Sequence, residues 1–385
     1  MFAAFFYAAR LYFKLCLQSL SRRRNLGKLT LRGRLLRLLL FILFFPIWVL
    51  HWLGLLLDEV LFPGYRKVKI ARPVFILGVP RSGTTFLHRT LSEDKERYTS
   101  VSTWEVFLAP SVCQRKFWLA LAGLDQLIGR PISRLLGVVE KRLFKSLQGV
   151  HDVSLQAPEE DYLLLLPLLS CFILFLPFTE SRHIWQLARF DWEASDRDRA
   201  MIMKFYRACL QKHLYVFGKG RRYLSKNASF ASWPQTLYSE FPDAQFVVCM
   251  REPSHAVPSL LGSLKGGAEF FDLNLEAGEL PELLLEMMRQ YYRHLLTQFP
   301  TDAPIVHMQG LRKDIVATVQ YLYRRLELEI TQDYLSILEG IGETAQHYQT
   351  RNRAVNPFQA EVADFYRERF PWYYRDTADP PPEHR

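Results

Sequence analysis

An apolar run passes directly into a loop whose residues can hold a phosphate. Residues 74–85 read VFILGVPRSGTT, and a helical stretch begins at about Thr84. Loops of the form G-x-x-x-x-G-K-[ST] cradle nucleotide phosphates with backbone amides, and their lysine reaches the terminal phosphates. Gly78 and Gly83 keep that glycine spacing, but Thr84 occupies the lysine position and the positive charge lies at Arg81. The loop and the helix that follows it therefore predict a site for a phosphate-like anion, without the usual triphosphate and magnesium chemistry.

A second cationic loop follows the apolar run Phe246–Met250. Arg251 comes immediately after this run, and Ser259 stands eight residues later. The pair is a weak signal alone, but a guanidinium and a hydroxyl at this spacing can converge on one phosphate. Together the two loops predict contacts to both ends of one nucleotide.

Both loops require a sheet that brings their preceding strands together. From about Val68 onward, apolar strand-like runs alternate with helical stretches, which predicts a parallel sheet covered by helices on both faces. Ligands of such sheets bind at the carboxyl ends of the strands, where both loops fall. The expected strands are Val74–Leu77, Phe246–Met250 and Ile305–Met308, and the expected helices are Thr84–Leu91, Phe117–Leu127, Arg197–Tyr215, Leu280–Gln298 and Ile315–Leu326. The fold class is α/β, a three-layer parallel sheet with a P-loop-like phosphate-binding loop.

The N-terminal region has a membrane-like composition. The chain of 385 residues carries a net charge of +10, and no Asp or Glu precedes Asp58. In an aromatic-rich helical segment, Arg10, Lys14 and Gln18 are spaced four apart and form one polar stripe, typical of an interfacial helix. Residues 38–57 carry no formal charge, and this length can span a bilayer. We therefore expect a membrane-associated helical region and a lipid surface as a partner.

The sequence leaves open how this region meets the membrane. Arg37 precedes the uncharged run, Lys67 follows it and Pro46 interrupts it, so a spanning helix and a kinked, re-entrant or in-plane anchor both fit. A buried helical hairpin in a soluble oligomer is the alternative to membrane attachment. We divide the chain into a helical region at 1–65, a catalytic domain at 66–356 and a C-terminal extension at 357–385. A second apolar run, Tyr162–Phe178, contains prolines and is interpreted as buried core or as a wall of the acceptor site.

The two loops carry a family resemblance. The string Gly78–Thr85 resembles the 5′-phosphosulfate loop of sulfotransferases that use 3′-phosphoadenosine 5′-phosphosulfate (PAPS), especially tyrosylprotein and bacterial-type enzymes. Arg251 and Ser259 match the 3′-phosphate pair of that superfamily, including its spacing. The resemblance implies PAPS as donor substrate and no required metal. The residues implied to bind the donor are Arg81, Ser82, Gly83, Thr84, Thr85, Arg251 and Ser259.

The resemblance also implies catalytic residues. Lys226 is similar to a lysine that contacts the transferring sulfuryl group, and the resemblance implies that Arg81 contacts this group as well. Glu105 lies near the position of the catalytic glutamate of those relatives, and a carboxylate there could take the proton of the acceptor hydroxyl. The segment 151–161 is similar to one beside the acceptor pocket, so His151 and Glu160 are alternative bases. Residues 308–311, MQGL, depart from the Tyr-Glu-Asp-Leu string of many relatives, which leaves the adenine contacts undefined.

These residues predict a membrane-associated sulfotransferase that acts on an acceptor hydroxyl. A lipid or other hydrophobic alcohol is one acceptor class that the membrane location suggests. A P-loop kinase or NTPase and a non-catalytic membrane adaptor on the same fold are the alternatives, and nucleic acid is not an expected partner. The sequon at Asn227 would place a sugar beside Lys226, which favours a cytoplasmic catalytic domain over the Golgi lumen.

Overall fold

The computed structural model describes residues 1–20, 23–24, 27–28, 30–131, 134, 137, 154–276, 278–346, 358 and 362–374. The strands are β1 (Arg23–Arg24), β2 (Gly27–Lys28), β3 (Val74–Gly78), β4 (Tyr98–Thr99), β5 (Arg222–Lys226), β6 (Gln245–Met250) and β7 (Ile305–His307). The helices of the first half are α1 (Phe2–Leu20), α2 (Leu31–Leu61), α3 (Thr84–Ser92), α4 (Thr103–Leu108), α5 (Val112–Leu127), α7 (Arg182–Leu187) and α8 (Phe190–Glu193). Those of the second half are α9 (Asp196–Phe217), α10 (Pro234–Glu240), α11 (Pro253–Phe270), α12 (Glu279–Thr297), α13 (Met308–Lys313), α14 (Ile315–Arg325), α15 (Gln332–Gln346), α16 (Val362–Arg369) and α17 (Pro371–Tyr374). Four 3₁₀ turns complete the described elements: η1 (Pro63–Lys67), η2 (Asp161–Leu165), η3 (Phe172–Phe175) and η4 (Ala228–Ser232).

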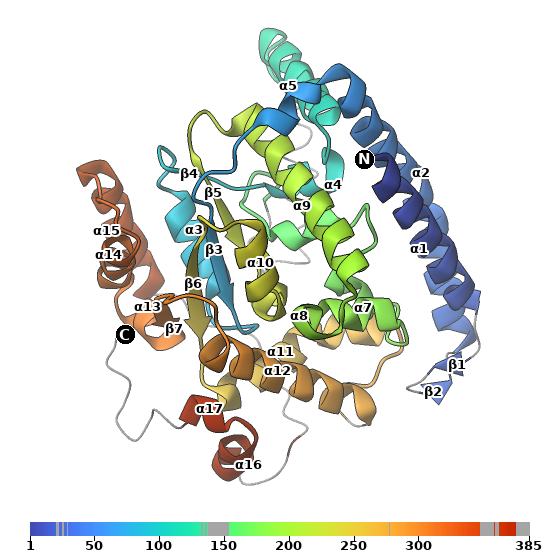
Figure 1. The fold of residues 1–385 in the computed structure, drawn as a ribbon, viewed down its shortest axis with the longest axis vertical. Helices are drawn as coiled ribbons and strands as arrows, with labels where there is room; N and C mark the ends of the chain where they lie inside the picture. The colour runs from blue at the N-terminus through green and yellow to red at the C-terminus, as the bar shows by residue number, and fades with distance from the viewer. Residues whose placement is uncertain are drawn as a thin grey trace.

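A five-stranded parallel sheet forms the centre of the fold, in the order β4-β5-β3-β6-β7 (Figure 1). Its central strand β3 pairs with β5 on one side and with β6 on the other, with Gly78 opposite Cys249. All five residues of β3 are buried, as expected for a strand that is covered on both faces. The phosphate loop and the loop after β6 therefore begin at adjacent strand ends, and the prediction of an α/β fold with a parallel sheet is confirmed.

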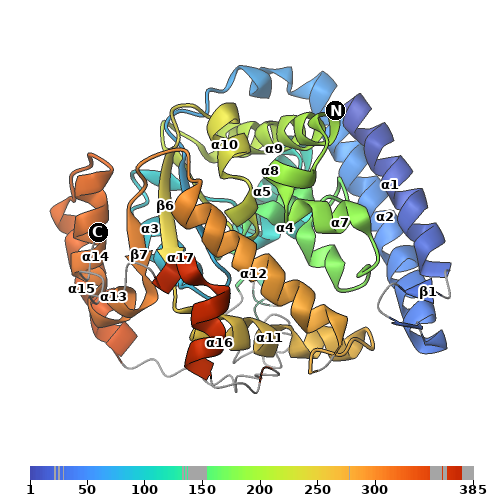
Figure 2. The same cartoon turned by 60° about the horizontal axis from the view of Figure 1, so that its bottom comes forward.

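Alternating side chains of β3 point into two separate cores. Val74 and Ile76 pack among buried residues of α3, α13, α14 and α15. Phe75 and Leu77 pack in a larger core that includes residues of α9, α10, α11 and α12. Figures 1 and 2 show α14 and α15 on one side of the sheet and α9, α10 and α12 on the other. The three layers follow from this alternation.

The N-terminal and C-terminal helices pack onto the catalytic domain. Ala4 and Ala8 of α1 and Trp52 of α2 belong to the same core as Phe75 of the sheet. At the other end of the chain, the ring of Phe370 packs against Tyr292 of α12. The three ranges assigned from the sequence thus contribute to one continuous body.

The sequence-based elements agree with the structure at their centres and differ at their ends. The short strand β4 and the strand β5 were not expected, because β5 begins and ends with a basic residue and has little apolar alternation. Helix α11 was not expected either, since it contains Pro253 and Pro258; Pro253 occupies the first turn, where proline is tolerated. The apolar run Tyr162–Phe178 lies in the core around η2 and η3, as the interpretation of this run as core expected.

Among the described helices, α2 is the one long and apolar enough to cross a membrane. A third of its most apolar window is nevertheless buried inside the protein.

Candidate active site

The phosphate loop is held in a conformation that depends on its glycines. Arg81 and Gly83 both adopt left-handed backbone angles, with φ of 69° and 92°. A Cβ at Gly83 would lie 2.4 Å from Sδ of Met308, and one at Gly78 would lie 2.4 Å from the carbonyl oxygen of Cys249. The loop is therefore pressed against β6 on one side and α13 on the other. Only glycine fits at positions 78 and 83.

Helix α3 presents the start of its backbone toward this loop. Its N-cap residue Gly83 provides no side-chain hydrogen bond to the first turn. The first amides of a helix without a side-chain cap are available to an anion, and the helix dipole favours negative charge there. Ser82, whose hydroxyl donates to the carbonyl oxygen of Val79 at 2.6 Å, fixes the turn from within. Thr84 and Thr85, the first two residues of α3, line the adjoining cavity.

The second loop meets the first through three of the predicted residues. Nη1 of Arg251 donates to the backbone oxygen of Arg81 at 3.2 Å, and Nε of Arg81 donates to Oγ of Ser259 at 3.1 Å. Tyr292 donates its hydroxyl to the backbone oxygen of Arg251 and so fixes the end of β6. Burial, followed by the positive charges of Arg312 and Arg81, lowers the pKa of Arg251. Mutual repulsion of this kind is relieved when a negatively charged ligand binds between the cations.

Lys226 and Glu160 form an ion pair beside the loop. Lys226 is the last residue of β5, one strand away from the phosphate loop, and its side chain is 3% exposed. Its Nζ donates to Oε1 of Glu160, which immediately precedes η2. Glu160 lines the cavity, so the pair places one carboxylate in the cavity wall and one buried ammonium behind it.

These groups surround a cavity of about 770 Å³. Its lining includes four guanidinium groups from α3, α13 and both loops, which are Arg81, Arg89, Arg251 and Arg312. Other lining residues are apolar and come from the run near η3 and from α11 and α12; they include Phe172, Ile173, Phe175, Leu264 and Met287. The cavity thus combines an anion-binding wall with a hydrophobic wall, and Glu160 adds a carboxylate to the lining.

Glu105 does not line this cavity. It is 3% exposed, and its carboxylate accepts hydrogen bonds from the backbone and hydroxyl of Ser102 at 3.0 Å and from Nδ1 of His213 at 2.8 Å. Arg115 forms an ion pair with it at 3.1 Å. Burial raises its pKa, but the charges of His213 and Arg115 outweigh that effect and hold the pKa at about 2. A carboxylate that is occupied in this way is a poor proton acceptor, so its placement favours a structural role over the predicted catalytic one.

The other predicted bases differ in their placement. Glu160 lies in the cavity wall, whereas His151 lies outside the described residues. Asn227 itself is completely buried, so the sequon carries no information about the compartment.

Sequence reasoning missed Arg89 and Arg312. Arg89 stands four residues after Thr85 on α3, and this helical spacing could have placed it on the same side of the helix as the phosphate loop. Arg312 stands four residues after Met308 on α13, in the stretch that departs from the Tyr-Glu-Asp-Leu string. Both line the cavity, so α13 contributes a cation and a thioether at the edge of the site.

Comparison with known proteins identifies the fold and the family. The chain is similar in structure to the sulfotransferase STF1 from Mycobacterium tuberculosis H37Rv, with 19% sequence identity, a TM-score of 0.68 and coverage of 95% of this chain and 92% of that one. It is also similar to the sulfotransferase STF9 from Mycobacterium avium, with 16% identity, a TM-score of 0.68 and coverage of 97% and 95%. No curated protein sequence matches the chain. A model of the sulfotransferase family matches residues 73–333, which is more than half of the chain and includes both loops. The chain therefore belongs to the sulfotransferase family.

Proposed function

We propose that the protein moves a sulfuryl group from PAPS to the hydroxyl of a hydrophobic acceptor at a membrane surface. The observation that carries this proposal is one cavity whose lining combines Arg81, Arg251 and the start of α3 with apolar side chains. The cations of the anion-binding wall can pair with two phosphates and a sulfate. The apolar wall suits an alcohol with a hydrocarbon or aromatic body.

The reaction begins with attack of the acceptor oxygen on sulfur. The bond between sulfur and the bridging oxygen of the 5′-phosphate breaks, and 3′,5′-adenosine bisphosphate leaves with the electron pair. Negative charge then increases on that bridging oxygen, where the amides at the start of α3, Arg81 and Lys226 can stabilise it. Donors arranged in advance in this way are worth about 3–4 kcal/mol each when one is removed.

Glu160 is the carboxylate that we propose as the general base. It lines the cavity, and Lys226 holds it in place beside the expected position of the sulfuryl group. It would accept the proton of the acceptor hydroxyl as the new S–O bond forms. Ser259 and Arg251 would bind the 3′-phosphate, with Arg312 at the same end of the cavity.

Thermal stabilisation by 3′,5′-adenosine bisphosphate, set beside ATP with magnesium, tests the donor. At 100 times its dissociation constant a ligand adds about 2.7 kcal/mol to the free energy of unfolding. We expect the bisphosphate to raise the melting temperature and Arg251→Ala to abolish the shift. If ATP with magnesium stabilises the protein and the bisphosphate does not, a kinase or NTPase would be favoured instead. The presence of Thr84 in place of the P-loop lysine argues against that function.

The acceptor class is tested with ³⁵S-labelled PAPS and a panel of alcohols. We expect transfer to dodecanol or 2-naphthol to exceed transfer to glucose, because the wall formed by Phe172, Phe175 and Met287 binds hydrocarbon surface. Faster transfer to glucose than to either hydrophobic alcohol would contradict the proposed acceptor.

A further inference from the structure

The outward face of α1 is an apolar stripe. Phe2, Phe6, Phe13, Leu17 and Leu20 are spaced by three, four or seven residues, which places them on one helix face, and each side chain is more than half exposed. The opposite face, which includes Ala4, Ala8, Leu11 and Leu15, is buried against the rest of the protein. Helix α1 thus has apolar side chains on both its buried and its exposed face.

Helices α2 and α5 extend this apolar surface. On α2 the side chains that are more than half exposed include Leu35, Leu39, Ile42, Leu43, Leu50 and Leu53. On α5 they include Phe117, Leu124 and Leu127. Figures 1 and 2 show α1 and α2 side by side along one edge of the molecule, and α5 packs beside the last part of α2. We refer to these outward side chains of α1, α2 and α5 as the hairpin face. Exposed apolar side chains in this number on three neighbouring helices mark an interaction site.

The inward face of α2 is bound to the domain at its beginning. The N-cap residue Thr30 donates its hydroxyl to Oδ2 of Asp272 at 2.6 Å. Seven residues later, Arg37 is 1% exposed and pairs with Glu180 at 2.5 Å. Arg37 also donates to the backbone oxygen of Pro177 at 2.9 Å. Charged groups of the domain therefore lie directly under the first turns of the helix.

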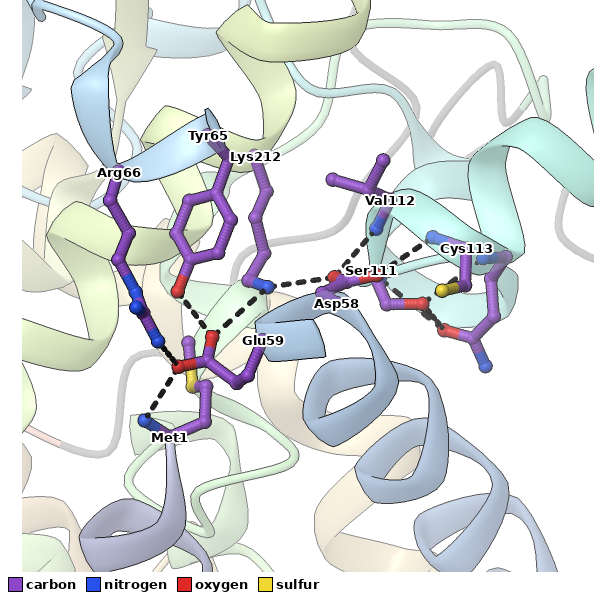
Figure 3. A network of polar contacts seen from close by, with 10 residues as sticks. Met1, Asp58, Glu59, Tyr65, Arg66, Ser111, Val112, Cys113 and Lys212 are labelled. Atoms are coloured by element: carbon purple, nitrogen blue, oxygen red, sulfur yellow. Dashed lines mark hydrogen bonds and ion pairs between the residues drawn. The ribbon is translucent and has the colours of Figure 1, made fainter. Parts of the chain in front are cut away.

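The middle and the end of α2 are bound to the domain as well. Trp48 and Trp52 both donate their indole N–H to the backbone oxygen of Pro167, at 2.8 and 3.1 Å. Asp58 pairs with Lys212 of α9 at 2.7 Å, and both side chains are completely buried. The same carboxylate accepts hydrogen bonds from the first two backbone amides of α5, each at 2.8 Å (Figure 3). One residue thus joins α2, α5 and α9.

These contacts argue against a spanning α2. From Thr30 to Asp58 the anchored length is about 42 Å at 1.5 Å per residue, longer than the hydrocarbon core of a bilayer, about 30 Å. If α2 crossed the bilayer, the part of the domain packed against its middle, including the backbone around Pro167 that Trp48 and Trp52 contact, would enter the hydrocarbon with it. Removing such loops and their polar groups from water is strongly unfavourable. The helix can meet lipid along its outward side only if its axis lies in the membrane plane.

The charge of this region indicates which surface it contacts. Residues 1–57 contain nine Lys or Arg residues and no Asp or Glu. Arg10 and Lys14 are exposed on α1 between the apolar side chains of the hairpin face. Long basic side chains at such positions keep their stems in the apolar layer and extend their charges to the headgroups. A second copy of this chain would present the same basic segment and no carboxylate from it, whereas anionic phospholipids complement it.

We propose that the hairpin face is a monotopic membrane-binding surface on anionic bilayers, with α1, α2 and α5 lying in the interface and α2 not crossing it. This inference deepens the membrane placement proposed above and is independent of the transfer chemistry. It predicts that the protein binds one leaflet of the bilayer and that the catalytic domain stays in the water on the side of that leaflet.

Flotation with vesicles tests the binding surface. The full-length protein is mixed with vesicles of phosphatidylcholine alone or with 30% phosphatidylglycerol, and bound protein is measured after centrifugation. We expect stronger binding to the anionic vesicles and weaker binding at high salt. The double variant Leu43→Glu and Leu50→Glu should bind at least about tenfold more weakly than the wild type. The matched control, Tyr238→Glu with Phe270→Glu, changes exposed aromatic residues of α10 and α11 and should bind like the wild type. Failure of the wild type to float, or equal loss in both variants, would overturn the proposal.

Side-specific labelling tests the orientation. Leu31→Cys and Leu61→Cys place single thiols at the two ends of α2, at positions 62% and 59% exposed, in a background of Cys16→Ser and Cys113→Ser. Protein added to sealed vesicles is treated with a membrane-impermeant maleimide from outside. We expect the two thiols to react to the same extent as each other, because both ends of α2 would lie in the outer leaflet. Reaction of one thiol only, with the other reacting after detergent, would show a spanning helix and overturn the proposal. Neither result depends on sulfuryl transfer, so failure of the proposed enzymatic function would be recognised separately.

Discussion

Arg81 donates from Nε to Oγ of Ser259 at 3.1 Å, across 178 residues of sequence. The contact exists because β3 and β6 are adjacent parallel strands, so the loops that follow them leave the sheet side by side. Arg251 closes the group by donating to the backbone oxygen of Arg81 at 3.2 Å. The phosphate loop and the loop after β6 therefore form one cationic site, and a change in either loop should affect the binding of the whole donor.

We expect Ser259→Ala to weaken binding of 3′,5′-adenosine bisphosphate by about 1–3 kcal/mol, since it removes a hydrogen bond to a charged group. Arg251→Ala should weaken it further, because it removes a charge as well. Isothermal titration calorimetry measures both losses. Arg289→Ala is the control, since Arg289 pairs with Glu286 on α12 outside the cavity. Unchanged affinity in Arg251→Ala would show that the nucleotide does not bind at this loop.

Replacing the proposed base should lower the rate and leave donor binding intact. For Glu160→Gln we expect kcat to fall about 10²- to 10⁴-fold, the usual contribution of a general base. The dissociation constant of the bisphosphate should change little, since Glu160 is proposed to contact the acceptor and not the nucleotide. Glu269→Gln, on the exposed surface of α11, controls for the loss of one negative charge. A kcat within about threefold of the wild type would transfer the role to another group, such as His151.

Glu105→Gln should act on stability instead of catalysis. The substitution leaves Arg115 buried without its ion-pair partner, which typically costs about 3–5 kcal/mol of unfolding free energy. Denaturant unfolding measures this loss, and the activity per folded molecule should stay near the wild-type value. The opposite pattern, a stable protein with a much reduced kcat, would restore Glu105 as a catalytic residue.

The sequence contained the signal for this structural role of Glu105. Ser102-Thr-Trp-Glu105 has the S-x-x-E spacing of a capping box, and the structure shows the two reciprocal hydrogen bonds of that motif. The capping-box spacing predicts a structural role for Glu105, whereas the family resemblance implied a catalytic role for the same residue. Local spacing could predict the cap, but it could not predict that Arg115 and His213 would complete the cluster from α5 and α9.

Strands and loops were predictable from the sequence where their conformation depends on residues within the same segment. The run that becomes β3 is continuously apolar, and its two glycines are required by close contacts, so sequence alone located the phosphate loop. In contrast, Arg312 enters the cavity only because α13 packs across Gly83, a contact between segments more than 200 residues apart. The in-plane orientation that we propose for α2 is argued from its contacts with the rest of the protein, such as those with Glu180 and Lys212, and the hydropathy of the helix itself carries no information about these contacts.

Acid should destabilise the protein in part through His88. Its ring lies behind the phosphate loop, 1% exposed, and burial followed by the charge of Lys226 lowers its pKa to about 3. The unfolded chain, with a pKa near 6.5, binds more protons between about pH 3 and pH 6.5. The contribution of His88 is therefore complete above pH 6.5 and is lost as the pH falls, by about 1.4 kcal/mol per unit.

Urea unfolding at pH 7.5 and 5.5 isolates this effect when the wild type is compared with His88→Gln. The wild type should lose about 1.4 kcal/mol more than the variant over this interval. His255→Gln, at an exposed position of α11, should keep the wild-type pH dependence. Equal losses in the wild type and His88→Gln would mean that this histidine is not buried in its neutral form.

Gly83→Ala should disrupt donor binding by two separable effects. The residue has a φ of 92°, which costs a residue with a side chain about 1–2 kcal/mol, and the new Cβ would lie 2.4 Å from Sδ of Met308. The thioether of Met308 would have to move to make room for the new Cβ. Because Met308 lines the cavity, its displaced side chain would collide with the donor. Adding Met308→Ala should then recover part of the binding of 3′,5′-adenosine bisphosphate, because it removes the contact but not the backbone strain. Gly123→Ala, where a Cβ meets nothing within 4 Å, should bind normally. If the double variant binds no better than Gly83→Ala, the backbone conformation alone requires the glycine, and α13 does not limit the donor site.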